Sequence, residues 1–228
     1  MKLFNTIISI AALSGAMLLS GAVLSNVALA SDNAYYEVTI TNITQGEVFT
    51  PIMVASHRHN TKLFKLGETA STELEIIAES GNPGPLADSL ISSGAALDVA
   101  TADGVLFPGA SLTLTVRTDR QHSHVSVASM LVPTNDAFFA VNGIHGPRGK
   151  HSKTVYSPAY DAGTENNDEL CANIPGPPFA CTGEGFNEAS GEGYVYIHPG
   201  IHGGGDLSAA SYDWNNPVAK ITIRRIKE

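Results

Sequence analysis

The fold of this chain is decided by residues 129–143, which read SMLVPTNDAFFAVNG. An apolar run rich in β-forming residues ends in the turn-forming cluster Pro-Thr-Asn-Asp at 133–136, and a second apolar run follows at once. This stretch predicts a strand, an acidic turn and a second strand. Such a turn places carboxylate oxygens at one end of an all-β domain, where a hard cation or a partner can reach them.

Further strands are predicted by alternation of apolar and polar residues with a period of two. This pattern covers residues 35–43 and 112–118 and, imperfectly, residues 218–226, and residues 194–198 are predicted to form another strand. Residues 48–55 are another β candidate, but Pro51 stands early in it, so we expect an edge or bulged strand there. Residues 125–132 are more continuously apolar than these segments, which is typical of a strand buried on both faces.

The spacing of Leu74, Ile77 and Ala78 predicts a short amphipathic helix over 71–79 with a Ser or Thr cap. Residues 86–91 suit a further helical turn, and residues 143–193 read as a long loop-rich insertion. No internal repeat or linker divides the chain. We therefore expect an all-β fold, a single antiparallel β-sandwich over residues 31–228 with one or two short helices.

The first thirty residues have the features of a signal peptide. Lys2 is followed by an apolar run from Leu3 to Leu29, and Ala28-Leu29-Ala30 is an A-x-A cleavage signal. We predict cleavage after Ala30 and export to the cell envelope, the periplasm or the medium, with no membrane insertion of the mature chain. An uncleaved anchor is the alternative, because the apolar run is long enough to span a bilayer.

The composition limits the classes of partner. The net charge of −9 disfavours nucleic acid and anionic membrane surfaces, and it favours solubility and cations. Only 15% of residues are charged, whereas 22 residues are Gly and 12 are Pro. This balance suits many turns and short strands.

The two cysteines, Cys171 and Cys181, flank a Pro/Gly-rich segment. In an exported protein they most simply form one disulfide that staples the long insertion. A free thiol pair or half of a zinc site is the alternative interpretation.

Acidic residues occur in two turns. Asp136 and Asn142 flank Phe138-Phe139, and Asp161 and Glu165 flank Ala162-Gly163-Thr164. If the two turns meet at one end of the sandwich, they offer the oxygen ligands that Ca²⁺ prefers. Asp and Asn are also common in turns for local reasons, since they bond their own backbone.

The two turns together resemble the signature of the spondin N-terminal domain family. Its members carry a run like V-P-S-P-D-W-F-V-G-V-D, followed downstream by Y-D-A-G-T-D. Here residues 132–142 read VPTNDAFFAVN and residues 160–165 read YDAGTE, and the opening and closing strands are also similar to those of the family. The resemblance implies a C2-like β-sandwich with a divalent cation, Ca²⁺, at one edge, and Asp136 and Asp161 correspond to its ligands.

This sequence departs from the family pattern at Ala137, Asn142 and Glu165. A further acidic ligand of the family precedes a His-Ser pair; counting back from that pair reaches Arg117, and the nearest acid is Asp119. The candidate metal ligands are therefore Asp136, Asp161, Asp119, Asn142 and Glu165.

Histidines provide a competing hypothesis. His198 and His202 lie in a glycine-rich segment with Asp206 close behind, a set that could hold a transition metal in a secreted metal-dependent enzyme. No metal-hydrolase pattern and no nucleophile elbow accompany them, and surface histidines or hydrogen-bonded structural histidines are the plainer interpretation.

The resemblance favours a binding module over an enzyme. It implies adhesion or recognition of an unknown cell-surface, matrix or glycan partner. A metal-dependent enzyme using His198 and His202 and a purely structural envelope protein are the alternatives.

Overall fold

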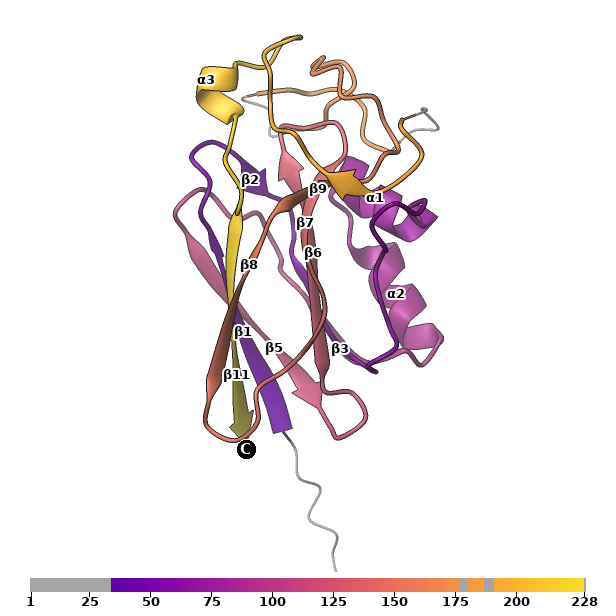
Figure 1. The fold of residues 1–228 in the computed structure, drawn as a ribbon, viewed down its shortest axis with the longest axis vertical. Coiled ribbons are helices and arrows are strands. Elements are labelled where there is room, and N and C mark those ends of the chain that lie inside the picture. Colours follow the sequence, from indigo (N-terminus) through magenta and orange to yellow (C-terminus); the bar gives the residue numbers. More distant parts are fainter. Residues whose placement is uncertain (1–33, 177–179, 187–190, 228) are drawn as a thin grey trace, which may run out of the picture. The chain divides into compact units, whose positions relative to one another are not determined.

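The structure is a computed structural model that describes residues 34–176, 180–186 and 191–227. The predicted signal peptide lies outside these residues. Two antiparallel sheets face each other (Figure 1). The smaller sheet has the strand order β5-β1-β11-β8. Its strands are β1 (Ala34–Asn42), β5 (Ser111–Thr118), β8 (Ser152–Ser157) and β11 (Ala219–Lys227).

The larger sheet has the order β10-β9-β7-β6-β3-β4, and β2 pairs with β6 beside this path. Its strands are β2 (Val48–Phe49), β3 (Met53–His57), β4 (Ala96–Thr101), β6 (His124–Val132), β7 (Ala137–His145), β9 (Ala159–Asp161) and β10 (Tyr196–Ile197). The predicted antiparallel β-sandwich is confirmed.

The core between the sheets follows from the alternation in the sequence. In β1, Val38 and Ile40 point inward and are fully buried, opposite Ile223 and Ile221 of β11. Burying one such side chain contributes about 1.5–3 kcal/mol relative to exposure. Strands β1 and β11, the first and last strands of the domain, therefore pair with each other in the centre of the smaller sheet.

Two helices cover the outer face of the larger sheet. Helix α1 (Thr72–Ser80) starts at Ser71, whose Oγ accepts the backbone N–H of Leu74 at 3.3 Å, and ends at Gly81 in the left-handed region. Helix α2 (Gly84–Ser92) follows directly. Both predicted helices are confirmed, although α2 is longer than the expected turn. A short third helix, α3 (Ala209–Tyr212), was not predicted.

The apolar runs around the first acidic turn are buried on both faces, as expected for β6. In β7 the two consecutive phenylalanines face opposite layers. Phe139 packs against Phe49 between the sheets, with ring centroids 4.4 Å apart. Phe138 packs under the helical layer, with its centroid 5.3 Å from that of Phe64. Phe139 and Phe138 therefore place one strand, β7, in both the core between the sheets and the core under the helices.

Two sequence predictions need correction. Residues 48–55 form two strands, β2 and β3, because Pro51 interrupts the pairing, and β3 lies between β6 and β4 instead of at an edge. The supposed loop from 143 to 193 contains β8 and β9, and the pattern over β4 was missed. β4 is half-buried along most of its length and β8 exposes the aromatic Tyr156, so neither strand shows a clear alternation of apolar and polar residues.

Candidate functional site

The first acidic turn joins β6 to β7 at the end of the sandwich that we call the loop end, because residues 162–176, 180–186 and 191–218 gather above it (Figure 1). The turn is closed by Thr134, whose hydroxyl donates to the carbonyl of Leu131 and accepts the N–H of Ala137 at 3.1 Å. This local bonding holds Asp136 at the start of β7, where it is fully buried.

The second acidic turn reaches the first through strand pairing. In the register between β7 and β9, Ala137 lies opposite Asp161, and the N–H of Ala162 donates to the carbonyl of Asp136 at 3.3 Å. The backbone then turns at Gly163, which has φ +68°. A Cβ at this position would lie 2.3 Å from the carbonyl oxygen of Tyr194, so only glycine fits.

The turn after Gly163 presents its donors to Asp136. Oδ2 of Asp136 accepts the N–H of Thr164 at 2.8 Å, the N–H of Glu165 at 3.1 Å and the hydroxyl of Thr164 at 3.3 Å. Oδ1 of Asp136 is buried and has no hydrogen-bond partner among the described residues. Oδ2 of Asp136 thus accepts three hydrogen bonds, whereas Oδ1 accepts none from the described residues.

Asp161 is the second carboxylate of the pair. Its Oδ1 accepts the N–H of Gly163 at 2.7 Å, and its Oδ2 accepts Nδ2 of Asn167 at 2.6 Å. Burial, and then the charge of Asp161, raise the pKa of Asp136 well above its usual range. Burial also raises the pKa of Asp161. Two neighbouring carboxylates whose pKa values are both raised by burial attract either a proton or a cation.

The donor set at this pair fits a hard cation. Carboxylate oxygens suit Ca²⁺ better than the softer transition metals, and Ca²⁺ accepts backbone carbonyls and water as its remaining ligands. The unpartnered Oδ1 of Asp136 is the observation that fits such an ion. Among the residues that the structure describes, no three His, Cys, Asp or Glu side chains are arranged to hold a metal. Side chains alone therefore do not complete the coordination.

The structure brings only some of the predicted ligands together. Glu165 lies buried beside Asp136, to which its N–H donates. Asn142 lies further along β7, where its amide accepts from the N–H of Leu63 and donates to the carbonyl of Phe64. Asp119 lies in the β5–β6 connection, at the end opposite the loop end, and accepts from His122. Asn142 and Asp119 are therefore not part of this cluster.

The Spondin_N family profile matches residues 36–172. The chain belongs to the spondin N-terminal domain family. The match spans well over half of the chain and contains both acidic turns. A comparison with curated proteins finds no match.

In this spondin domain, strand β11 lies beyond the matched residues, yet it pairs with both β1 and β8 in the smaller sheet. The sandwich is therefore completed by residues outside the match. The family is one of extracellular, non-catalytic domains. Within the described residues, no helix is both long enough and apolar enough to cross a membrane.

The competing histidine site is not assembled for metal binding. Nδ1 of His198 accepts the N–H of Gly200 at 3.0 Å, so Nε2 carries the proton and donates to Oδ1 of Asn167 at 3.0 Å. Nε2 also lies 3.7 Å from Oδ2 of Asp161. Burial lowers the pKa of His198 to about 4. This neutral, fully bonded ring supports Asn167 beneath the carboxylate pair, while His202 is exposed.

The glycine-rich segment serves a different carboxylate, which the sequence reading missed. Glu169 accepts the backbone N–H groups of His202 and Gly204 at 2.5 and 2.7 Å. Although burial raises its pKa, the four backbone donors of residues 202–205 hold the pKa of Glu169 below its usual range. The run of glycines after His202 is the signal that could have suggested an anion-binding loop.

The disulfide between Cys171 and Cys181 is confirmed. The N–H of Cys171 donates to Oδ2 of Asp206 at 2.9 Å, which ties the stapled segment to the residues just after the glycine run. The loop end is thus held by the disulfide, by Glu169 and by the Asp136–Asp161 cluster.

Proposed function

We propose that this spondin domain is an exported binding module. Its acidic turns take up Ca²⁺ and hold the surrounding loops in place for a cell-surface, matrix or glycan partner. The observation that carries the proposal is the buried, unpartnered Oδ1 of Asp136 beside the second carboxylate of Asp161. Asp136 and Asp161 are the residues that would hold the ion. The ion would supply positive charge where two buried negative charges meet.

Family membership supports a binding role over catalysis. The chemistry of the cluster points the same way, because the one buried histidine near it is neutral and has both ring nitrogens engaged. A catalytic base or a zinc ligand needs a free ring nitrogen. Elemental analysis of protein purified without chelator tests this choice: stoichiometric zinc lost on His202→Ala would overturn it.

Export is supported by the A-x-A sequence before Ser31 and by the disulfide, which persists in oxidising compartments. Expression with the native leader, followed by intact mass measurement of the exported protein, tests the cleavage site. The proposal expects a chain that starts at Ser31. A product that keeps residues 1–30 and stays in the membrane fraction would support the uncleaved anchor.

Calcium binding is tested by titration calorimetry on the purified chain. We expect a dissociation constant on the order of 10⁻⁴–10⁻³ M, as in other extracellular calcium modules. Asp161→Asn should abolish the binding heat. Asp119→Asn is the matched control, because it removes the same charge at the opposite end, and it should bind as the unaltered chain does.

Partner recognition is tested by retention of the domain on cells or extracted matrix, in CaCl₂ and in EDTA. The proposal expects retention that depends on Ca²⁺ and is lost in Asp161→Asn. Retention of the same strength in both buffers and both proteins would remove the link between the ion and recognition. An absence of any retention would favour the purely structural alternative.

A further inference from the structure

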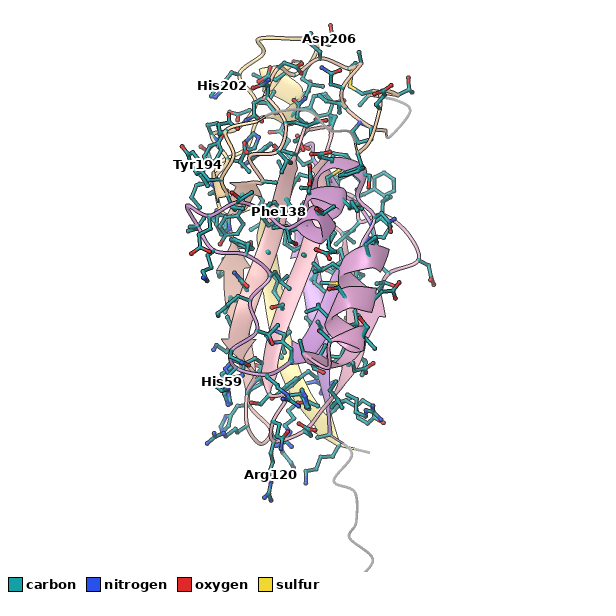
Figure 2. The ribbon with its side chains drawn as sticks, turned by 90° about the vertical axis from the view of Figure 1, so that its right-hand side faces the viewer. His59, Arg120, Phe138, Tyr194, His202 and Asp206 are labelled. Carbon is teal, nitrogen blue, oxygen red and sulfur yellow. A yellow bond between two sulfur atoms is a disulfide. The ribbon has the colours of Figure 1, made fainter. Side chains whose placement is uncertain are left out.

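The end of the sandwich opposite the loop end gathers most of the cationic side chains of the chain. We call it the basic end. Figure 2 places Arg120 and His59 there, whereas His202 and Asp206 lie at the loop end. Strand register brings the residues together from four chain segments. They are Arg58, Lys62, Arg117, Arg120, Arg148, Lys150, Lys153, Arg224, Arg225 and Lys227, with six of the eight histidines.

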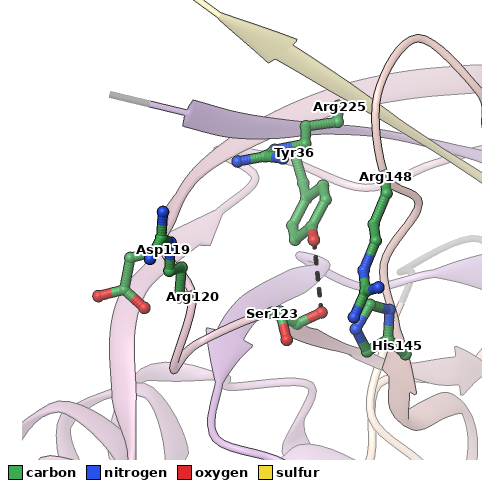
Figure 3. A pocket seen from close by; sticks show the side chains of 7 residues that line it. All are labelled: Tyr36, Asp119, Arg120, Ser123, His145, Arg148 and Arg225. Carbon is green, nitrogen blue, oxygen red and sulfur yellow. Dashed lines mark hydrogen bonds between the residues drawn. The ribbon is translucent and has the colours of Figure 1, made fainter. Parts of the chain in front are cut away.

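A hollow of about 400 Å³ opens at the centre of the basic end. Three guanidinium groups and an imidazole surround the ring of Tyr36 there (Figure 3). The lining residues are Tyr36, Asp119, Arg120, Ser123, His145, Arg148 and Arg225.

The floor of this hollow is built by close packing. The hydroxyl of Tyr36 donates to the carbonyl of Ser123 at 3.4 Å, and the ring lies against Gly146. A Cβ on Gly146 would lie 2.3 Å from Cζ of Tyr36. Since Tyr36 is itself 97% removed from solvent, the hollow has a fixed base instead of a mobile side chain.

Within the described residues, the three guanidinium groups around the hollow, those of Arg120, Arg148 and Arg225, have no salt-bridge partner. Nε of Arg225 is buried and has no hydrogen-bond partner in the described part of the chain. The one carboxylate in the lining, Asp119, accepts instead from the backbone and ring of His122, at 2.7 and 2.9 Å. The three guanidinium groups are therefore placed to bind an anion in the hollow.

Two further hollows, each of about 360 Å³, adjoin the first. One shares Arg120 and Ser123 with it and continues to Arg58 and His59, among others. The other shares Arg225 and is lined also by Gly149, Lys150 and Lys227. The shared side chains place the three hollows next to one another, and we call the three together the track. A track of separate cationic hollows matches a ligand that carries anionic groups at intervals.

We propose that this track binds a linear anionic polysaccharide. A sugar chain with sulfate or carboxylate groups offers anions to the arginines and hydroxyls to polar neighbours such as Ser123, Asn60 and Gln121. Nucleic acid suits the track less, because base stacking needs open aromatic faces and Tyr36 is buried. The track shares no residue with the calcium proposal, so the two can fail separately.

The test is binding of the full chain to immobilised heparin and polygalacturonate at low salt, with neutral dextran and a single-stranded oligonucleotide as comparisons. Arg120→Gln/Arg148→Gln removes two exposed charges from the track. Lys65→Gln/Lys220→Gln is the matched control, because it removes two exposed charges elsewhere and leaves the same net charge. Melting temperatures confirm that both variants are folded, and the single variants Arg120→Gln and Arg148→Gln replace the double one if it is not.

The unaltered chain should bind at least one polysaccharide and not dextran. The track variant should bind at least ~10-fold more weakly, and the control should stay within about twofold of the unaltered chain. The slope of log K against log salt concentration should fall by about two in the track variant, because two fewer counterions are released on binding. Binding of heparin alone or polygalacturonate alone supports the proposal and identifies the anionic group. Three results overturn it: no polysaccharide binding, equal losses in both double variants, or tighter arginine-dependent binding of the oligonucleotide.

Discussion

The substitution Asp136→Asn separates the calcium site from ordinary packing. The change is nearly isosteric and removes one of two buried negative charges. The amide oxygen can still accept the N–H groups of Thr164 and Glu165, which Oδ2 accepts in the structure. The NH₂ group takes the place of Oδ1, which has no partner to lose. Repulsion from Asp161 disappears at the same time.

The structure gives the expected magnitudes. In EDTA, Asp136→Asn should be as stable as the unaltered chain or more stable, because its three accepted hydrogen bonds survive. Asp136→Ala loses those three bonds, at about 1 kcal/mol each, and should lose roughly 3 kcal/mol. With Ca²⁺ at about 100 times its dissociation constant, the unaltered chain should gain about 2.7 kcal/mol. For a domain of this size that gain is about 5–10 °C in melting temperature.

The assay is thermal unfolding in EDTA and in CaCl₂, followed by calorimetry or near-ultraviolet dichroism. The unaltered chain and Asp119→Asn should both gain stability from Ca²⁺, and Asp136→Asn should gain none. A calcium response that survives Asp136→Asn would refute the assignment of the ion to this pair. A loss in EDTA as large as that of Asp136→Ala would refute the claim that Oδ1 is unused.

Three other perturbations test separate parts of the fold. Burial, and then the charge of Asp213, raise the pKa of Glu47 well above its usual range, and neither oxygen has a hydrogen-bond partner among the described residues. The folded state therefore holds this proton more tightly than the unfolded state, and Glu47 costs stability as pH rises above the unfolded-state pKa. Glu47→Gln should gain on the order of 1–3 kcal/mol at neutral pH and less near pH 4, in urea titrations at both pH values; an equal effect at both would contradict the reasoning. Gly163→Ala should lower the free energy of unfolding by more than the roughly 1–2 kcal/mol that a left-handed alanine costs, because its Cβ would also clash with the backbone of Tyr194. Gly67→Ala is the control: Gly67 also has a positive φ but lies in open space, so the loss should be only roughly 1–2 kcal/mol. Equal melting temperatures of the two variants would argue against close contact between Gly163 and Tyr194. Replacing both cysteines by serine should cost about 2–3 kcal/mol in the same titrations while the calcium response remains, and an unchanged midpoint would mean that the staple does not constrain the unfolded chain.

The elements that local pattern controls were predicted well. Alternation in residues 35–43 and 218–226 set the faces of β1 and β11, and the run from 129 to 143 gave β6, the turn and β7. Ser71 and the spacing of Leu74 and Ile77 gave α1. In each case neighbouring residues contain the information, because a period of two or 3.6 is a local property.

The candidate site was harder, since long-range register decides which acids meet. Asp136 meets Asp161 only because β7 pairs with β9 so that Ala137 faces Asp161. Asp119 was chosen by counting back along the chain, which does not say at which end of a sandwich a turn lies. The hydrogen bonds that hold His198 and Glu169 in place join residues 31 to 35 positions apart. No local signal specifies such partners.

The basic end was missed for a related reason. Its charges come from separate segments near residues 58, 120, 148 and 225, each beside the end of a strand. Antiparallel strands alternate in direction, so every second connection lies at the same end of a sandwich. Once the strand order is known, the clustering follows from the sequence.

The pairing of Ala34 with Lys227 has a practical consequence for anyone who handles this domain. Its first strand begins and its last strand ends at the basic end, beside the hollow lined by Arg225 and Lys227. An affinity tag, a dye or a fusion partner joined to either strand would crowd the basic end and leave the acidic loops free.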